Sequence, residues 1–330
     1  MKALALGLVG LVLGGIGGAA AASFDCARAG TPFERAICAF PELSDADETL
    51  AVAWQTAIGG LSKPALAQMQ AGQKAWLGFA ERSCSPTAEA LVDPVTDEQA
   101  QCLASQFRQR IGRLEQSRMQ DGLRVFIEDR YEVILDTTAE PDAWNKVATL
   151  EAGQPRLDGD SDLAAAFADF IDTATPALGG EIEETSDISR ITTITEVTAA
   201  RISVTINDYW YGHGAAHGNY GITHAHFLRE PMRALVAEDI FAAQGWQEEL
   251  GRLVLAALDQ SVEGGIWDDA RAEVPALSAD PSRWALSAEG LALTFQPYEV
   301  TAYAAGAPVV TIPWAQLGAW LAPGALDLAW

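Results

Sequence analysis

The chain has 330 residues and is short of three kinds of residue: bases, cysteines and histidines. Its 21 lysines and arginines face 45 aspartates and glutamates, and the formal net charge of −24 disfavours nucleic acid and anionic membranes as partners. The sequence also has no G-x-S-x-G motif, no phosphate-binding Walker loop and no H-E-x-x-H motif. These absences leave no familiar catalytic pattern, so they favour a binding protein without a cofactor.

Long apolar runs are also scarce, and the clearest one lies at the N-terminus. Lys2 precedes an apolar stretch over residues 3–16, and small residues follow it as far as Ala22. A cationic start, a short apolar run and a small-residue exit predict a signal peptide over residues 1–22, cleaved near Ala22. The run is shorter than the ~20 residues of a membrane span, so we expect no membrane anchor. We therefore expect a periplasmic or secreted protein.

The cysteines are confined to the N-terminal third of the chain. In an oxidising compartment, an even number of cysteines within one segment predicts disulfides and not free thiols. Four cysteines allow three pairings, and the local pairing would close two short loops that each stabilise the fold by ~3 kcal/mol. A zinc site would need closer pairs, such as C-x-x-C. The four are Cys26, Cys38, Cys84 and Cys102.

Charge divides the mature chain into two expected domains, residues 23–118 and 119–330. The first holds 12 acidic and 9 basic residues, and the second holds 33 acidic and 11 basic residues. The excess acid therefore lies almost wholly on the second domain, where it would steer a strongly basic partner. Simple solubility is the alternative explanation.

In residues 23–118 the apolar residues recur three and four positions apart, which is the pattern of one face of a helix. Ser44 and the acidic residues after it predict a helix start, and Pro64 fits the first turn of the next helix. A third helix is expected from about Gln99. Three helices and two disulfides predict a small stapled bundle.

Three motifs in this domain, "FDCARAGTPFERAIC", "QKAWLGFAERSC" and "CLASQFRQRIGRLE", carry a family resemblance over about 95 residues. The domain resembles the LprI-like lysozyme inhibitor family, which implies binding to lysozyme. Most matching positions are cysteines or core residues, so the resemblance assigns no residue to a lysozyme contact. The matching residues are Phe24, Asp25, Cys26, Glu34, Ala36, Ile37, Cys38, Leu43, Asp47, Gln73, Trp76, Leu77, Cys84, Cys102, Leu103, Arg110, Ile111 and Leu114.

From residue 119 onward the apolar pattern changes to alternation with a period of two. It predicts strands in "RVFIEDRYEVIL", a hairpin turning at Ala199-Ala200, a strand in "NYGITHAHFL" and closing strands in "WALSAEGLALTF" and "APVVTIPW". Helices are expected after Ser161, over residues 247–261 and over residues 315–321. We therefore expect an α+β fold: the stapled helical bundle followed by a larger domain of antiparallel sheet and helices.

Residues of roughly 200–325 carry a second resemblance, in "YGHGAAHGNYG", "EDIF" and "GLALTFQPYEVTAYAAG". They are similar to a domain shared by the anti-sigma factor RsiV and the non-catalytic part of the peptidoglycan deacetylase PdaC. The resemblance implies an extracytoplasmic domain without catalysis, which in RsiV senses lysozyme by binding it. The matching residues are Gly214, Ala215, Ala216, His217, Gly218, Asp239, Ile240, Phe241, Gly290, Leu291, Phe295, Tyr298, Glu299, Tyr303, Gly306, Ile312 and Pro313.

All four histidines of the chain lie within fourteen residues, at His213, His217, His224 and His226. The glycines around the first two disfavour a helix, because each costs ~1 kcal/mol relative to alanine, and they predict a loop between strands. On a strand the last two share one face, so with His217 they are weak candidates for a metal site. We favour the alternative, in which His217 is buried against the loop backbone and the other two lie on a solvated face.

The candidate partner-binding residues are those beside this loop, Trp210, Tyr211, His213 and His217. The leading hypothesis is binding or inhibition of a lysozyme-type muramidase, or binding of another basic protein. The alternative is binding of peptidoglycan or another glycan through Trp210 and Tyr211, since aromatic rings stack on sugars. A histidine-based metallohydrolase is a third hypothesis, disfavoured because no obvious carboxylate base lies near residues 211–226.

Overall fold

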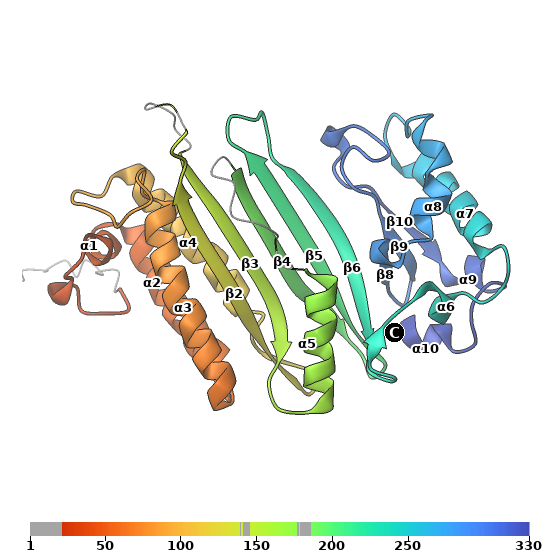
Figure 1. Cartoon of the computed structure of the whole chain (residues 1–330), viewed down its shortest axis with the longest axis horizontal. Helices are drawn as coiled ribbons and strands as arrows, with labels where there is room; N and C mark the ends of the chain where they lie inside the picture. Colours follow the sequence, from red (N-terminus) through yellow and green to blue (C-terminus); the bar gives the residue numbers. More distant parts are fainter. Residues whose placement is uncertain (1–21, 139, 141–145, 177, 179–185, 330) are drawn as a thin grey trace, which may run out of the picture.

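The computed structural model describes residues 22–138, 140, 146–176, 178 and 186–329. The expected signal peptide therefore lies, except for Ala22, outside the described residues. A helical part, a central sheet and a smaller C-terminal unit follow one another along the long axis of the molecule (Figure 1). The α+β fold expected from the sequence is confirmed.

The N-terminal part consists of helices held by two disulfides. The cysteines pair locally, Cys26 with Cys38 and Cys84 with Cys102. Pro41 stands at the first helical position of α2, where its fixed φ suits a helix start. The expected start at Ser44 is therefore wrong, and Ser44 is buried inside the helix. The helices are α1 (Pro32–Ala39), α2 (Pro41–Ile58), α3 (Lys63–Ser83) and α4 (Asp97–Leu114).

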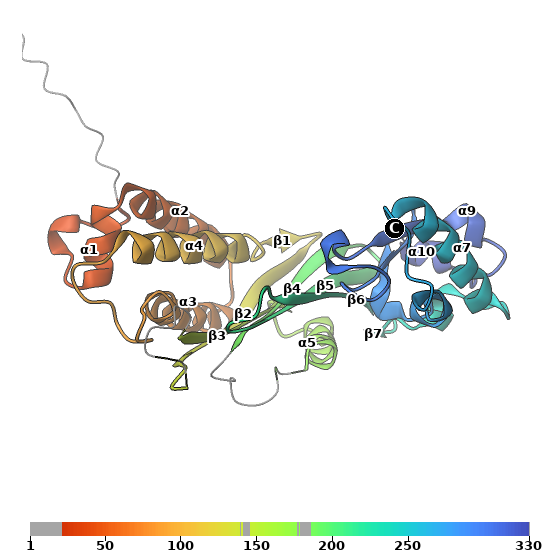
Figure 2. The ribbon, with the colours of Figure 1, turned by 90° about the horizontal axis from the view of Figure 1, so that it is seen from above.

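The described residues that follow form a seven-stranded sheet whose strands stand in chain order. Neighbouring strands are antiparallel except β3 and β4, which are parallel because helix α5 (Asp162–Ala174) connects them. Figures 1 and 2 show α5 lying against one face of this sheet. The strands are β1 (Met119–Gln120), β2 (Leu123–Leu135), β3 (Val147–Leu157), β4 (Ser186–Val197), β5 (Arg201–Gly212), β6 (Asn219–Leu228) and β7 (Arg233–Ala234).

The C-terminal unit surrounds a second small sheet, in the order β10-β9-β8, with helices. Its core is centred on the fully buried Trp284, against which Phe241 and Trp246 pack edge to face. Its elements are α6 (Ala237–Ile240), α7 (Trp246–Ser261), α8 (Val274–Ser278), β8 (Trp284–Leu286), β9 (Gly290–Thr294), β10 (Val309–Pro313), α9 (Trp314–Leu317) and α10 (Ala325–Ala329).

Both ends of the central sheet are built into their neighbours. Phe126 and Val133 of β2 belong to the same buried cluster as the N-terminal helices. At the other end, the fully buried Arg201 of β5 donates to the backbone oxygens of Leu286, Leu328 and Ala329. Among the described residues, no helix is both long enough and apolar enough to cross a membrane.

Candidate functional site

His213 and His217 lie in a loop between two strands, as the glycines around them predicted. β5 ends at Gly212 and β6 begins at Asn219, and the two strands pair in antiparallel register. Gly214 has a φ of +84°, a left-handed conformation that glycine adopts without strain. The loop stands at one end of the central sheet, next to the C-terminal unit (Figure 1).

His224 and His226 share one face of β6, as their spacing predicted, but that face is not solvated. His226 is only 4% exposed, with Nδ1 2.7 Å from the Ser203 hydroxyl and Nε2 2.8 Å from the Trp284 carbonyl. His224 lies between the hydroxyls of Thr205 and Thr294. Burial lowers the pKa of both, that of His226 to about 3. The expectation of a solvated face is wrong, because residues of the C-terminal unit cover it.

The other two histidines occupy different surroundings. The His213 side chain is 6% exposed, with its ring nitrogens 3.8 Å from Asp136 Oδ2 and 3.6 Å from Asp187 Oδ2, and neither nitrogen has a hydrogen-bond partner among the described residues. His217 is exposed, so the expectation of a buried ring is wrong. Its Nδ1 does lie 2.8 Å from the Gly218 carbonyl, which is the loop contact expected.

The four histidines therefore do not converge. Within the part of the chain that the structure describes, no group of three or more histidine, cysteine, aspartate or glutamate side chains is placed to hold a metal ion. His217, His224 and His226, the weak metal candidates, make separate contacts. The arrangement gives the metallohydrolase hypothesis no site among these residues.

Aromatic rings gather beside the loop. The His217 ring stacks on Tyr303 with 4.1 Å between the ring centroids, and Tyr298 packs on the same tyrosine. Tyr298 is half exposed and has a φ of +66°, which is unusual for a residue with a side chain. Of the predicted pair, Trp210 is 47% exposed, whereas Tyr211 is half-buried.

Tyr298 and Tyr303 also belong to this surface, although the sequence did not predict it. Both occur in the second family pattern, but they lie about 80 residues after the loop in the chain. Tyr303 reaches the loop by donating its hydroxyl to the Gly218 carbonyl over 2.8 Å. The packing of the C-terminal unit on β6 brings the tyrosines and the loop together, and no local sequence pattern predicts such packing.

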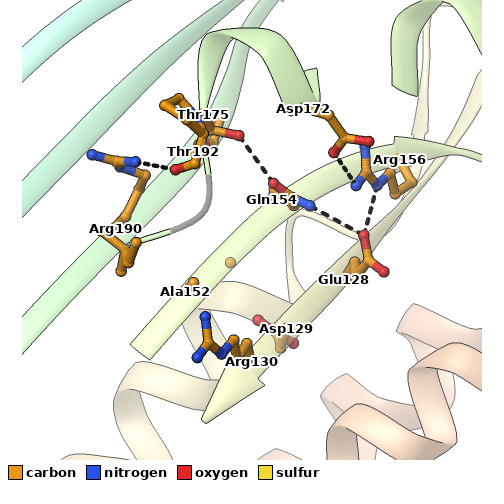
Figure 3. Close-up of a pocket in the computed structure, with 13 residues that line it drawn as sticks. Glu128, Asp129, Arg130, Ala152, Gln154, Arg156, Asp172, Thr175, Arg190 and Thr192 are labelled. Atoms are coloured by element: carbon orange, nitrogen blue, oxygen red, sulfur yellow. Dashed lines mark hydrogen bonds and ion pairs between the residues drawn. The ribbon is translucent and has the colours of Figure 1, made fainter. Parts of the chain in front are cut away.

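A cavity of about 410 Å³ lies between α5 and strands β2, β3 and β4 (Figure 3). Arg156 stands between Glu128 and Asp172, at 2.7 and 2.6 Å, and Thr175 donates to Gln154. The other lining arginines, Arg130 and Arg190, are also ion-paired. Since these charges are already matched, we assign the cavity no catalytic role.

A buried charged cluster joins the N-terminal helices to the sheet. Arg110 of α4 donates to Gln73 of α3 over 2.9 Å and pairs with Asp129 of β2 over 2.5 Å. Arg113 pairs with the same aspartate and with Glu151 of β3. Burial raises the pKa of the nearby Tyr131 to about 12 and also raises that of Glu151.

This cluster explains two polar positions of the first resemblance, because Gln73 and Arg110 belong to its motifs. Residues 25–114 match the family Lysozyme inhibitor LprI. The chain carries an LprI-type domain. Its local disulfides and its capped helices α1 and α4 lie within the matched segment.

The C-terminal resemblance is also confirmed, since residues 238–315 match DUF3298, a family described as protein of unknown function. A solved DUF3298 family member from Bacteroides fragilis is 16% identical, covers 63% of this chain and 97% of its own, and has a TM-score of 0.46. One from Pseudomonas aeruginosa is also 16% identical, covers 60% and 95%, and has a TM-score of 0.42. No curated protein matches the chain.

Proposed function

We propose that the chain binds a lysozyme-type muramidase outside the cytoplasm and thereby inhibits or senses it. The observation that carries the proposal is the LprI-type domain over residues 25–114, with its two disulfides. The second resemblance supports the same partner, because the C-terminal residues resemble a domain of RsiV that senses lysozyme outside the cytoplasm.

The disulfides support the location. Disulfides persist in oxidising compartments, and both of these have ordinary Cα–Cα separations of 5.8 and 5.6 Å. We therefore place the mature protein in the periplasm or the medium, after removal of residues 1–22 near Ala22. In this proposal residues 23–118 and 119–330 are its two domains.

Charge supports a basic partner. Residues 119–330 hold 33 of the 45 acidic residues and only 11 bases, and lysozymes are commonly basic. Complementary charge speeds association more than it strengthens the final complex, and the gain falls as salt rises. We therefore expect fast, salt-sensitive association.

Calorimetric titration of residues 23–330 with egg-white lysozyme and with bacterial muramidases, at low and at physiological ionic strength, tests the proposal. We expect saturable binding that weakens as salt is added. A cell-wall turbidity assay on the same mixtures separates inhibition from sensing, since only an inhibitor slows the loss of turbidity.

The matched control is a basic protein of similar size and net charge without muramidase activity. Equal affinity for this control would mean that charge alone drives binding, and the proposal would then fail. It would fail equally if neither muramidase class bound at low salt.

A further inference from the structure

A second cavity, of about 570 Å³, lies beside the first and shares Arg190 with it. Its floor is formed by β4, β5 and β6, and its wall by residues 282–283 and 296–297 of the C-terminal unit. We call it the Trp210 groove. Its lining includes Ile188, Arg190, Asp208, Trp210, Asn219 and Arg283.

Trp210 offers a flat apolar platform in this groove. A side-chain carbon on Gly212 would stand 2.8 Å from Cη2 of the Trp210 indole, so the six-membered ring lies beside this glycine, which leaves room for it. Trp210 is nevertheless 47% exposed. An exposed indole suits stacking against the C–H face of a pyranose ring, which carries little polarity.

The polar groups around the platform are neutral as a set. Arg190 Nε lies 2.5 Å from Asp208 Oδ1, and Arg283 makes two 2.6 Å bonds to Glu299. Each cation in the groove is thus matched by a carboxylate, while the whole chain carries −24. A polyanionic ligand would be repelled by the molecule and would find no unmatched cation here.

Hydroxyl groups, by contrast, have partners in the groove. A carboxylate can accept about four hydrogen bonds, and the Asp208 side chain is 38% exposed while bonded to Arg190. Asn219, the cross-strand partner of Trp210, is exposed beside the ring. An aromatic platform flanked by an acceptor and an amide suits a neutral, hydroxyl-rich ligand.

The groove is also preformed. Gln296 in its wall accepts from the Ile222 N–H over 2.8 Å and donates to the Ile222 carbonyl over 2.7 Å, which fastens the wall to the edge of β6. A fixed wall lowers the cost of ordering the site when a ligand binds.

We propose that the Trp210 groove binds a neutral oligosaccharide, with one pyranose ring stacked on Trp210 and its hydroxyls bonded to Asp208 and Asn219. This binding is separate from muramidase recognition and does not depend on it. N-acetylated glycan strands and plain glucans share this chemistry, so both serve as probes.

The test is calorimetric titration of residues 23–330 with the tetramer of N-acetylglucosamine and with the tetramer of glucose. We expect saturable binding of at least one, and the preferred probe identifies the source of the glycan. The Trp210→Ala variant should bind about tenfold more weakly or worse, and Trp210→Phe should fall between it and the parent. Trp267→Ala is the matched control, because Trp267 is 41% exposed and lies outside the groove.

Saturation-transfer NMR on the unmodified chain guards against a variant that fails to fold, since it detects contact between the tetramers and the protein directly. No transfer to either tetramer, or equal binding by Trp210→Ala and the parent, would overturn the proposal. Loss of muramidase binding with retained sugar binding would leave it intact.

Discussion

At the scale of single residues, the clearest constraint is the neutral state of His226. The Trp284 carbonyl can only accept, so Nε2, 2.8 Å away, must carry the proton. Nδ1 then accepts from the Ser203 hydroxyl, whose oxygen in turn accepts from Arg201. A second proton on this ring would lie beside that guanidinium and break the chain of bonds. The contact between β6 and the C-terminal unit therefore requires an uncharged imidazole.

This requirement predicts acid sensitivity. The pKa of His226 falls from the ordinary 6.5 to about 3 in the folded protein, so between these pH values the unfolded state binds the extra proton. The contribution of His226 to the free energy of unfolding is therefore complete above pH 6.5. It falls as the pH is lowered towards 3, by up to about 1.4 kcal/mol for each pH unit. Urea unfolding at pH 7 and at pH 4.5 should show the loss.

The variant His226→Gln should lose less stability between these two pH values, although it is weaker at pH 7. His217→Gln, a change on an exposed ring, should follow the parent at both. An unchanged pH dependence in His226→Gln would show that another group causes the acid sensitivity.

The shared face of His224 and His226 could be predicted from their spacing, but their burial could not. The atoms that cover them come from Trp284 and Thr294, about 60 to 70 residues later.

At the scale of elements, Gly290 sets how closely β9 and β10 can pair. A side-chain carbon on Gly290 would stand 2.4 Å from the Ile312 carbonyl oxygen, which is backbone and cannot rotate away. Gly290 and Ile312 both belong to the second family pattern, so the close approach gives a physical reason for that glycine. Gly290 pairs with Pro313, and Ile312 pairs with Leu291, which pairs with Leu286 on its other side.

Gly290→Ala should therefore destabilise the protein by about 1–3 kcal/mol, the usual cost of overpacking. Gly78→Ala is the matched control, since nothing lies within 4 Å of its new carbon inside α3, and it should gain up to about 1 kcal/mol. Thermal unfolding of both variants gives the comparison. If Gly290→Ala left the stability unchanged, β10 would be able to shift away from the new side chain without loss of free energy.

Elements with a strong local signal were predictable. The alternation that continues through Val204 and the cap at Ser161 are local, and β5 and α5 formed where these signals stand. β3 escaped prediction because Pro155 and the small residues Ala152 and Gly153 obscure its alternation. Its parallel pairing with β4 depends on the crossover through α5, which no residue in β3 signals.

At the scale of the whole molecule, the LprI-type domain and the sheet share buried structure and are not merely tethered. The Arg110 and Asp129 side chains are 0% and 1% exposed, and they come from the two sides of the expected domain boundary. Removing one partner of such a pair is costly because the other charge stays buried without a match. The sequence could predict both family resemblances, but it could not reveal this link, because Asp129 stands in an ordinary alternating strand.

Asp129→Ala should therefore lower the free energy of unfolding by about 3–5 kcal/mol, through the unmatched Arg110. Asp93→Ala is the matched control: it removes the exposed partner of Arg35, and water solvates the remaining charge, so stability should change little. Amide hydrogen exchange on Asp129→Ala shows which elements lose stability. If the helices and the sheet unfold together at this contact, amides of α3 and α4 lose protection along with those of β2 and β3. If the helices kept full protection while β2 exchanged, the LprI-type domain would be an independent unit, and the muramidase binding proposed for it would not need the sheet.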